Sequence, residues 1–301
     1  MLVKEIIPLM RPRTLAAALS PVCIGAAFSY YAFGSTFSTI ESVINSLLIF
    51  IAIVFAQIIA NMWNEYCDHK SGLDKNQKVG NAGSITRGVM SPSLIMRLIQ
   101  CFMVVPIVLG IYLSATITWW YIPAGFFCIL ISFLYSGGPF PISRGPLGEL
   151  ASGLAMGLAI VLITAFAWTR QLSWALLIPA LPSIFLVGSI MLTNNIRDID
   201  NDRAHGRHTL PIVLGRDKAL QFMSTGYIFI YLWIIAWIFM GNLPIPSLLA
   251  LISAIPAFKA VQTLDRYVDV FQLDKAMSYT AMASISYNIL WSIGLIISKF
   301  I

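Results

Sequence analysis

Nine apolar stretches, each close to the length of a helix that crosses a bilayer, make up most of this 301-residue chain. A transmembrane helix needs about 20 predominantly apolar residues, and the chain is 58% hydrophobic and only 11% charged. The stretches lie at about Leu15–Gly34, Val43–Met62, Leu94–Ala115, Thr118–Leu134, Leu147–Trp168, Trp174–Ile196, Leu220–Met240, Pro246–Val261 and Tyr279–Ile297. The sequence therefore predicts an all-α, polytopic membrane protein, with residues 1–301 forming one transmembrane domain of about nine helices. Because the eighth stretch is short, eight or ten helices also fit the pattern.

Charged residues lie almost entirely on one side of this predicted bundle. With the amino terminus inside, 17 of the 19 Lys and Arg residues fall on the inner side, and only Arg170 and Lys299 fall outside. Of the 13 acidic residues, Glu41 alone lies on the outer side. The bias predicts a multi-pass protein of the cell membrane whose amino terminus and charged connections, at about 63–93 and 197–219, face the cytoplasm.

The two charged connections contain matching motifs. Asn64 and Asp68 are four residues apart, as are Asn194 and Asp198, and the second pair follows the first after 130 residues. Side chains four residues apart lie on the same face of a helix. The spacing therefore predicts an internal repeat, in which two similar polar faces at cytoplasmic helix ends oppose each other across the bundle.

Asp202 extends the second motif by one helical turn, whereas Asp200, two positions from each neighbour, is expected to face away.

Carboxylate and amide oxygens are ligands that suit magnesium, which is usually held by one or two carboxylates together with phosphate oxygens of a substrate. Two such faces could hold two magnesium ions on one diphosphate. Basic residues that could contact phosphate oxygens lie nearby, at Lys70, Arg87, Arg144, Arg203, Arg207 and Lys218.

Four segments of the chain resemble a known family, the intramembrane aromatic prenyltransferases of the UbiA superfamily. The arrangement of Asp-rich loops after the second and sixth helices is similar, and within the superfamily the segments are most similar to the menaquinone-pathway branch. The segments are NEYCDHKSGLD (64–74), VGNAGSITRGVMSP (79–92), YSGGPFPISRGPLGEL (135–150) and NNIRDIDNDRAHGRHTLPIVLGR (194–216).

The resemblance implies a magnesium-dependent enzyme that transfers a polyprenyl group from polyprenyl diphosphate to 1,4-dihydroxy-2-naphthoate. Decarboxylation would accompany the transfer, giving demethylmenaquinone and diphosphate. The membrane lipid is the expected environment, and neither nucleic acid nor a protein partner is expected.

The resemblance also implies roles for individual residues. Asn64, Asp68, Asp198 and Asp202 would hold magnesium and diphosphate and so form the catalytic set. The expected substrate contacts are Asp74, Arg87, Arg144, Asn194, Arg207 and Lys218, together with Tyr135, whose ring face could stabilise a carbocation. Glu65 stands where the family often has Asp, and its longer side chain leaves it outside the ligand set.

Other functions remain open from the sequence. A related enzyme could prenylate 4-hydroxybenzoate, homogentisate or haem. A phosphotransferase of the CDP-alcohol type also uses Asp-rich helices and metal, but its Asp-Gly-x-x-Ala-Arg start is absent. A transporter would need polar groups near mid-membrane, where these stretches have almost none.

Overall fold

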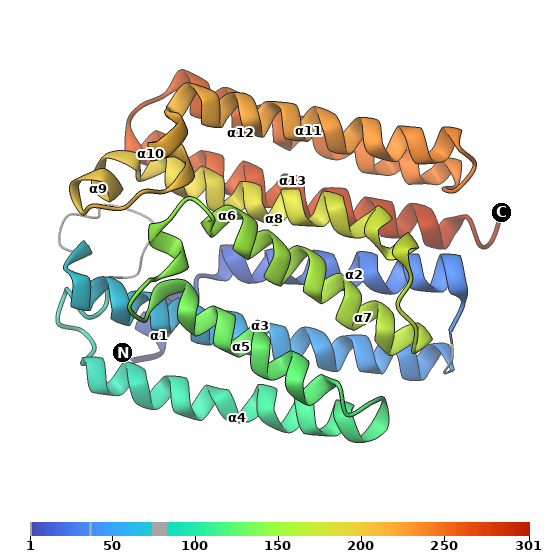
Figure 1. Cartoon of the computed structure of the whole chain (residues 1–301), viewed down its shortest axis with the longest axis horizontal. Coiled ribbons are helices and arrows are strands. Elements are labelled where there is room, and N and C mark those ends of the chain that lie inside the picture. The colour runs from blue at the N-terminus through green and yellow to red at the C-terminus, as the bar shows by residue number, and fades with distance from the viewer. Residues whose placement is uncertain (1, 36–37, 74–82) are drawn as a thin grey trace.

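The computed structural model of the chain describes residues 2–35, 38–73 and 83–301, and in these ranges it contains helices and no strands. The long helices run roughly parallel to one another, and the two termini lie at opposite ends of the bundle (Figure 1). The elements are α1 (Leu2–Met10), α2 (Pro12–Phe33), α3 (Thr39–Ser71), α4 (Pro92–Thr116), α5 (Tyr121–Ser136), the 3-10 turn η2 (Ile142–Arg144), α6 (Gly148–Ser152), the π-helical η3 (Gly153–Leu158), α7 (Ala159–Thr169), η4 (Trp174–Leu176), α8 (Leu177–Arg197), α9 (Ile199–Ala204), α10 (Leu210–Leu214), α11 (Arg216–Phe239), η5 (Ile245–Ser253), α12 (Ala254–Arg266) and α13 (Val270–Ile297).

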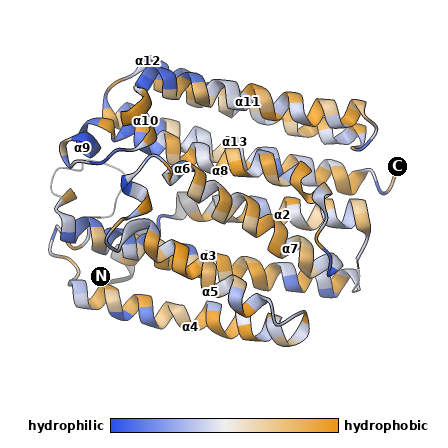
Figure 2. Cartoon of the chain, in the orientation of Figure 1, coloured by the Kyte–Doolittle hydropathy of each residue, from blue (hydrophilic) through white to orange (hydrophobic). Residues whose placement is uncertain are grey.

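The helices agree with the predicted bundle of about nine spans. Within the described residues, seven helical segments are long and apolar enough to cross a membrane, and two shorter apolar helices lie at Ala18–Phe33 and Tyr121–Ser136. Hydrophilic residues gather at the end of the bundle that carries α9 and α10, while the helix bodies are mostly hydrophobic (Figure 2). Apolar side chains such as Phe126, which is 62% exposed, cover the outside of these bodies. An apolar outer surface of this kind suits contact with lipid.

Local signals in the sequence account for several helix ends. The Ser38 and Ser91 side chains accept hydrogen bonds from the backbone amides of Glu41 and Leu94, which satisfies free amides at the starts of α3 and α4. Gly72 ends α3 in a left-handed conformation (φ 79°), as glycine commonly does after a helix. The first motif therefore lies in the last two turns of a helix whose end is well defined.

Close backbone packing fixes α6 and η3 against α8. A Cβ atom on Gly157 would lie 2.6 Å from the Cα and N atoms of Ile184, and one on Gly153 would lie 2.5 Å from the Ile184 carbonyl oxygen. These glycines therefore let the η3 backbone lie directly on the α8 backbone. The π-helical turn and α8 together form one wall of the region where the second motif lies.

The structure departs from the expected continuous helix at the second motif. The sequence predicts that Asn194, Asp198 and Asp202 follow one helix, but α8 ends at Arg197 and α9 begins at Ile199. Asp198 separates them with φ −97° and ψ 11°. The Asp202 amide still donates to the Asp198 carbonyl at 2.9 Å, so one helical turn is kept and the two carboxylates stay near each other.

Candidate functional site

A cavity of about 180 Å³ at the polar end of the bundle is lined by both motifs. Asn64 and Asp68 enter it from α3, and Asn194, Asp198 and Asp202 enter it from α8 and α9. The two polar faces thus share one cavity, as the repeat predicts.

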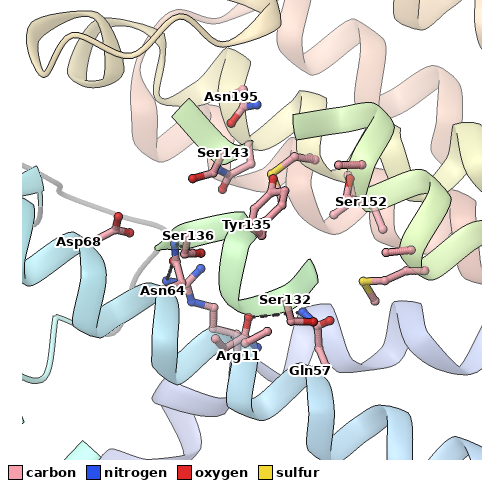
Figure 3. Close-up of a pocket in the computed structure, with 18 of the residues that line it drawn as sticks. Arg11, Gln57, Asn64, Asp68, Ser132, Tyr135, Ser136, Ser143, Ser152 and Asn195 are labelled. Carbon is pink, nitrogen blue, oxygen red and sulfur yellow. Dashed lines mark hydrogen bonds between the residues drawn. The ribbon is translucent and has the colours of Figure 1, made fainter. Parts of the chain in front are cut away.

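Tyr135 is central to this cavity. It projects from α5 into the space between the α3 side, with Asn64 and Asp68, and the α8 side, with Asn195 (Figure 3). The Tyr135 hydroxyl lies 3.3 Å from the position that a Cβ atom on Gly148 would take, so glycine at that position leaves room for the ring.

Arg207 connects the two motifs. Its Nη2 donates to Asp68 Oδ1 at 3.0 Å, and its Nη1 lies 3.3 Å from Asp202 Oδ1. The turn after α9 aims the side chain, because the Arg207 backbone amide donates to the Asp202 carbonyl at 3.0 Å. One guanidinium therefore offsets the charge of a carboxylate from each motif.

A second arginine holds Asp198. Arg197 Nε donates to Asp198 Oδ1 at 2.8 Å and Nη2 donates to Oδ2 at 2.7 Å, which is a bidentate pair. The same guanidinium donates to Asn194 Oδ1 at 2.8 Å and to Asp274 Oδ1 on α13 at 3.0 Å. Only 2% of the Arg197 side chain is exposed. Because a buried charge is costly unless it is fully paired, these contacts fix the orientation of Asp198.

A third arginine contacts the first motif. Arg11 Nη2 donates to Asn64 Oδ1 at 3.0 Å, and Asn64 Nδ2 donates to Ser136 Oγ at 3.2 Å. Arg11 itself has a left-handed backbone (φ 51°) and separates α1 from α2. A residue before proline disfavours the α conformation, so Pro12 accounts for the break at Arg11.

The carboxylate of Asp202 is paired through only one of its two oxygens. It is 2% exposed, and its Oδ2 has no hydrogen-bond partner among the described residues. The pKa of Asp202 is raised to about 6, mainly because the carboxyl is buried; the nearby charges of Asp198 and Asp68 contribute to the rise, and Arg207 opposes it. A cation beside Oδ2 would favour the ionised form.

The donor set fits magnesium held together with a phosphate-bearing ligand. Within the described ranges, no three or more His, Cys, Asp or Glu side chains are grouped closely enough to hold an ion by themselves. Magnesium does not require such a group, since it usually takes one or two carboxylates, waters and substrate phosphate oxygens. The unpartnered Asp202 oxygen and the amide and carboxylate oxygens of the first motif are donors of that kind.

The structure brings some of the predicted substrate contacts into the cavity and leaves others outside. Tyr135, Asn194 and Arg207 line it, as do the four predicted metal ligands. Three basic residues are exposed and absent from the lining, and one acidic residue falls outside the described residues. The exposed residues are Arg87, Arg144 and Lys218, and the residue outside the described ranges is Asp74.

Two features of the site lay outside the sequence predictions. Arg11 was counted only among the 17 inner basic residues, and nothing in its sequence position indicated that its side chain contacts Asn64. Glu149 is buried, and its Oε1 accepts from Asn195 Nδ2 at 2.9 Å. Nothing in the sequence pattern distinguished Glu149 from a loop carboxylate.

Glu65, which we did not expect to be a metal ligand, is absent from the cavity lining. Its Oε1 accepts a hydrogen bond from the Ser84 amide at 2.5 Å, and the side chain is fully buried. Glu65 therefore holds the segment after the first motif against α3.

Comparison with known proteins gives consistent matches over nearly the whole chain. The model of the UbiA prenyltransferase family matches residues 18–282. The chain is 36% identical over 299 residues to the 1,4-dihydroxy-2-naphthoate octaprenyltransferase of Bacillus subtilis, with 97% of this chain and 92% of the relative covered.

Two solved structures share the fold. The apo structure of a UbiA homolog from Aeropyrum pernix K1 has a TM-score of 0.70 at 17% identity, covering 95% of this chain and 98% of that one. A UbiA homolog from Archaeoglobus fulgidus bound to DMAPP and Mg²⁺ has a TM-score of 0.64 at 17% identity, covering 96% and 99%.

Proposed function

The chain belongs to the UbiA prenyltransferase family, and from that premise we propose that it prenylates 1,4-dihydroxy-2-naphthoate. The donor is a polyprenyl diphosphate, and the products are demethylmenaquinol, which is the hydroquinone form of demethylmenaquinone, together with diphosphate and carbon dioxide. The observation that carries the proposal is the shared cavity, in which both Asn-x-x-x-Asp motifs and Arg207 meet. The similarity to the Bacillus subtilis enzyme, over 97% of this chain, supports 1,4-dihydroxy-2-naphthoate as the acceptor.

The donor diphosphate binds between the two motifs in this proposal. Asn64 and Asp68 would hold one magnesium ion, and Asp198 and Asp202 would hold a second, each together with the diphosphate. Bound magnesium supplies positive charge that stabilises the departing diphosphate. A relative from Archaeoglobus fulgidus has been solved with DMAPP and Mg²⁺, which supports a divalent metal in this family.

The arginines change partners when the donor binds. Arg207 now contacts Asp68 and Asp202, and Arg11 contacts Asn64. Guanidinium groups match the geometry of phosphate oxygens, so both side chains can turn from the motif residues to the diphosphate. Arg197 is different, because Asn194, Asp198 and Asp274 surround it, and we assign it to holding Asp198 in place.

Transfer begins when the C–O bond of the allylic diphosphate breaks and diphosphate takes the electron pair. The ring of Tyr135 lies in the centre of the cavity, where its face can stabilise the allylic cation. The electron-rich naphthoate ring then forms the new C–C bond at the carbon that bears the carboxylate. Carbon dioxide leaves, and the electron pair of the broken C–C bond restores the aromatic ring. No strong protein base is needed for this step.

Three exposed basic residues are still proposed as substrate contacts, at the mouth of the cavity: Arg87, Arg144 and Lys218. Arg144 follows Ser143, which lines the cavity, and the Arg144 carbonyl accepts from the His208 amide at 2.8 Å. This bond joins Arg144 to His208, the residue after Arg207.

We further propose that this polar end of the multi-pass protein faces the cytoplasm, as the 17 inner Lys and Arg residues favour.

An acceptor panel tests the proposed function. Purified protein with magnesium and octaprenyl diphosphate is given 1,4-dihydroxy-2-naphthoate, 4-hydroxybenzoate or homogentisate, and products are identified by mass spectrometry. We expect demethylmenaquinol, detected as such or as demethylmenaquinone after oxidation in air, and released diphosphate with the first acceptor alone, and no product after chelation of the metal with EDTA. Product from another acceptor and none from dihydroxynaphthoate would overturn the assignment.

A further inference from the structure

Glu149 is a buried carboxylate that the proposed reaction does not use. It lies on α6 and is 6% exposed. Its Oε1 accepts from Asn195 Nδ2 at 2.9 Å, and its Oε2 has no hydrogen-bond partner among the described residues. In the same ranges, no Lys or Arg side chain forms an ion pair with Glu149. Because a carboxylate buried without a cation is destabilising, its contact with Asn195 is expected to serve the site.

Backbone packing fixes the position of Glu149. A Cβ atom on Gly188 of α8 would lie 3.0 Å from the Glu149 carbonyl oxygen, so the two backbones are almost in contact. The same carbonyl accepts from Ser152 Oγ at 3.0 Å. The Glu149 side chain is therefore anchored where α6 packs on α8, the helix that carries Asn195.

Asn195 presents one side of its amide group to the polar cavity. Figure 3 shows it on the opposite side of the cavity from Asn64, with Tyr135 between them. Its Nδ2 is bonded to Glu149, which is not part of the cavity lining. Its Oδ1 accepts no hydrogen bond from the described residues and is not enclosed by them. The oxygen is therefore the atom of this amide that a ligand in the cavity can reach.

The two adjacent asparagines of α8 have different partners. Asn194 Oδ1 accepts from Arg197, which also holds Asp198. Asn195 lies about 100° further around the helix, and it pairs with Glu149 instead. An ionised carboxylate only accepts hydrogen bonds. Glu149 therefore fixes the Asn195 amide with its nitrogen toward α6 and its oxygen toward the cavity.

The wall that α6, η3 and α8 form beside Asn195 suits a flat ring. Apart from the second motif, the residues that these elements contribute to the lining are uncharged, and most are small or apolar: Ala151, Ser152, Ala155, Met156, Ile190 and Met191. Binding sites for aromatic ligands are mostly apolar, with a few placed polar groups that fix orientation. Asn195 Oδ1 is a polar group of this kind.

We propose that Asn195 Oδ1 accepts a hydrogen bond from the 4-hydroxyl of the acceptor, and that Glu149 is a positioning residue that holds the Asn195 amide for this contact. The inference rests on the proposed function, because it assumes dihydroxynaphthoate as the acceptor. The 1-hydroxyl of that molecule lies next to the carboxylate and donates to it internally, which leaves the 4-hydroxyl as the donor for the protein. A ring held by this hydroxyl is oriented before the allylic cation forms.

Three naphthoates that differ only at ring position 4 test the contact in the unmodified sequence. They are 4-hydroxy-2-naphthoate, 4-methoxy-2-naphthoate and 2-naphthoate, each measured as a competitive inhibitor against dihydroxynaphthoate at saturating octaprenyl diphosphate. We expect the hydroxy compound to bind about tenfold more tightly than the other two, because only it can donate a hydrogen bond. A hydroxy compound that binds no more tightly than 2-naphthoate would overturn the proposal.

Variants test the two residues separately. Asn195→Ala removes the accepting oxygen, and Glu149→Met removes the group that holds it while keeping a side chain of similar length. In both, we expect the preference for hydroxynaphthoate over 2-naphthoate to fall to about twofold or less. The KM for dihydroxynaphthoate should rise about tenfold, and the KM for the donor should stay within about twofold of the parent. Glu149→Gln keeps an acceptor oxygen and should restore most of the preference.

Asn288→Ala is the matched control, since Asn288 is a buried asparagine on α13 that bonds Ser20 and Ser183 and is absent from the cavity lining. It should keep the hydroxyl preference of the parent, and an equal loss there would contradict a specific role for Asn195. A preference that survives in Glu149→Met would overturn the positioning role. Turnover of dihydroxynaphthoate by the parent is measured first. Its absence would mean that the proposed function fails, whereas turnover without a hydroxyl preference overturns the Asn195 contact alone.

Discussion

Arg207 Nη2 lies 3.0 Å from Asp68 Oδ1, a contact between residues 139 positions apart in the chain. The same guanidinium contacts Asp202, so it connects the two motifs that the sequence shows only as separate repeats. With 12% of its side chain exposed, Arg207 is partly shielded from water, which strengthens its pairing. The bridge holds the two motifs together at one cavity.

Replacing Arg207 with Gln should impair donor binding. The change removes a cation from between Asp68 and Asp202 and a partner for the diphosphate, so we expect kcat/KM for the donor to fall about 100-fold, mainly through KM. Steady-state kinetics with varied donor concentration measure this. Arg203→Gln is the control, because Arg203 is exposed and absent from the cavity lining. Equal losses in both variants would contradict a specific role for Arg207.

Asp68→Asn and Asp198→Asn should each lower turnover by about 100-fold or more, since each removes a negative charge that we propose as a ligand for magnesium at the diphosphate. Release of diphosphate gives the rate, and thermal unfolding checks that the variants fold. Asp200→Asn provides the comparison, because Asp200 lies between the two motif carboxylates in sequence but is exposed. Full activity of either motif variant would refute the metal assignment.

Glu65→Ala should destabilise the protein without a specific effect on donor binding. The change leaves the Ser84 amide without its charged acceptor, and we expect a loss of about 2 kcal/mol in the free energy of unfolding. Thermal unfolding in detergent measures the loss. Glu65→Gln keeps an acceptor oxygen and should lose less, and Glu41→Ala, at an exposed position, should lose almost nothing. A normal unfolding temperature for Glu65→Ala would show that this contact does not hold the segment.

Gly157→Ala tests the packing that supports the cavity wall. Its Cβ atom would lie 2.6 Å from the Ile184 backbone, so η3 or α8 must shift, and we expect a loss of about 1–3 kcal/mol in stability. Gly125→Ala on α5 is the matched control, because its Cβ atom would meet nothing within 4 Å. Unfolding temperatures of the two variants should therefore differ clearly. Equal temperatures would mean that the close approach at Gly157 is easily relieved.

The sequence alone was sufficient for the bundle and for the shared face of the first motif. Apolar stretches of bilayer length identify helices because a chain in lipid must satisfy its backbone hydrogen bonds internally. The four-residue spacing then identified Asn64 and Asp68 as neighbours on α3, and the structure places both in the cavity. The expectation that Asp200 turns away agrees with its exposure.

Features that depend on tertiary contacts could not be read from the sequence. The helix break at Asp198 has no proline or glycine to signal it, and the Arg197 contact to Asp274 on α13 joins positions 77 residues apart. The basic residues near the motifs looked alike in sequence, yet Arg207 lines the cavity while Arg87 and Lys218 do not. Tertiary packing sets the direction of a side chain at a turn. That direction determines which basic residue pairs with the motif carboxylates.

The pairing of Arg207 with Asp68 and Asp202 has a consequence for inhibition. Because the guanidinium serves as counterion to both aspartates, a molecule that displaces it has to compensate the aspartates that lose their arginine and the arginine that loses its aspartates. A neutral competitor offers neither charge. Effective blockers of this site should therefore be anions that arrive together with a divalent metal.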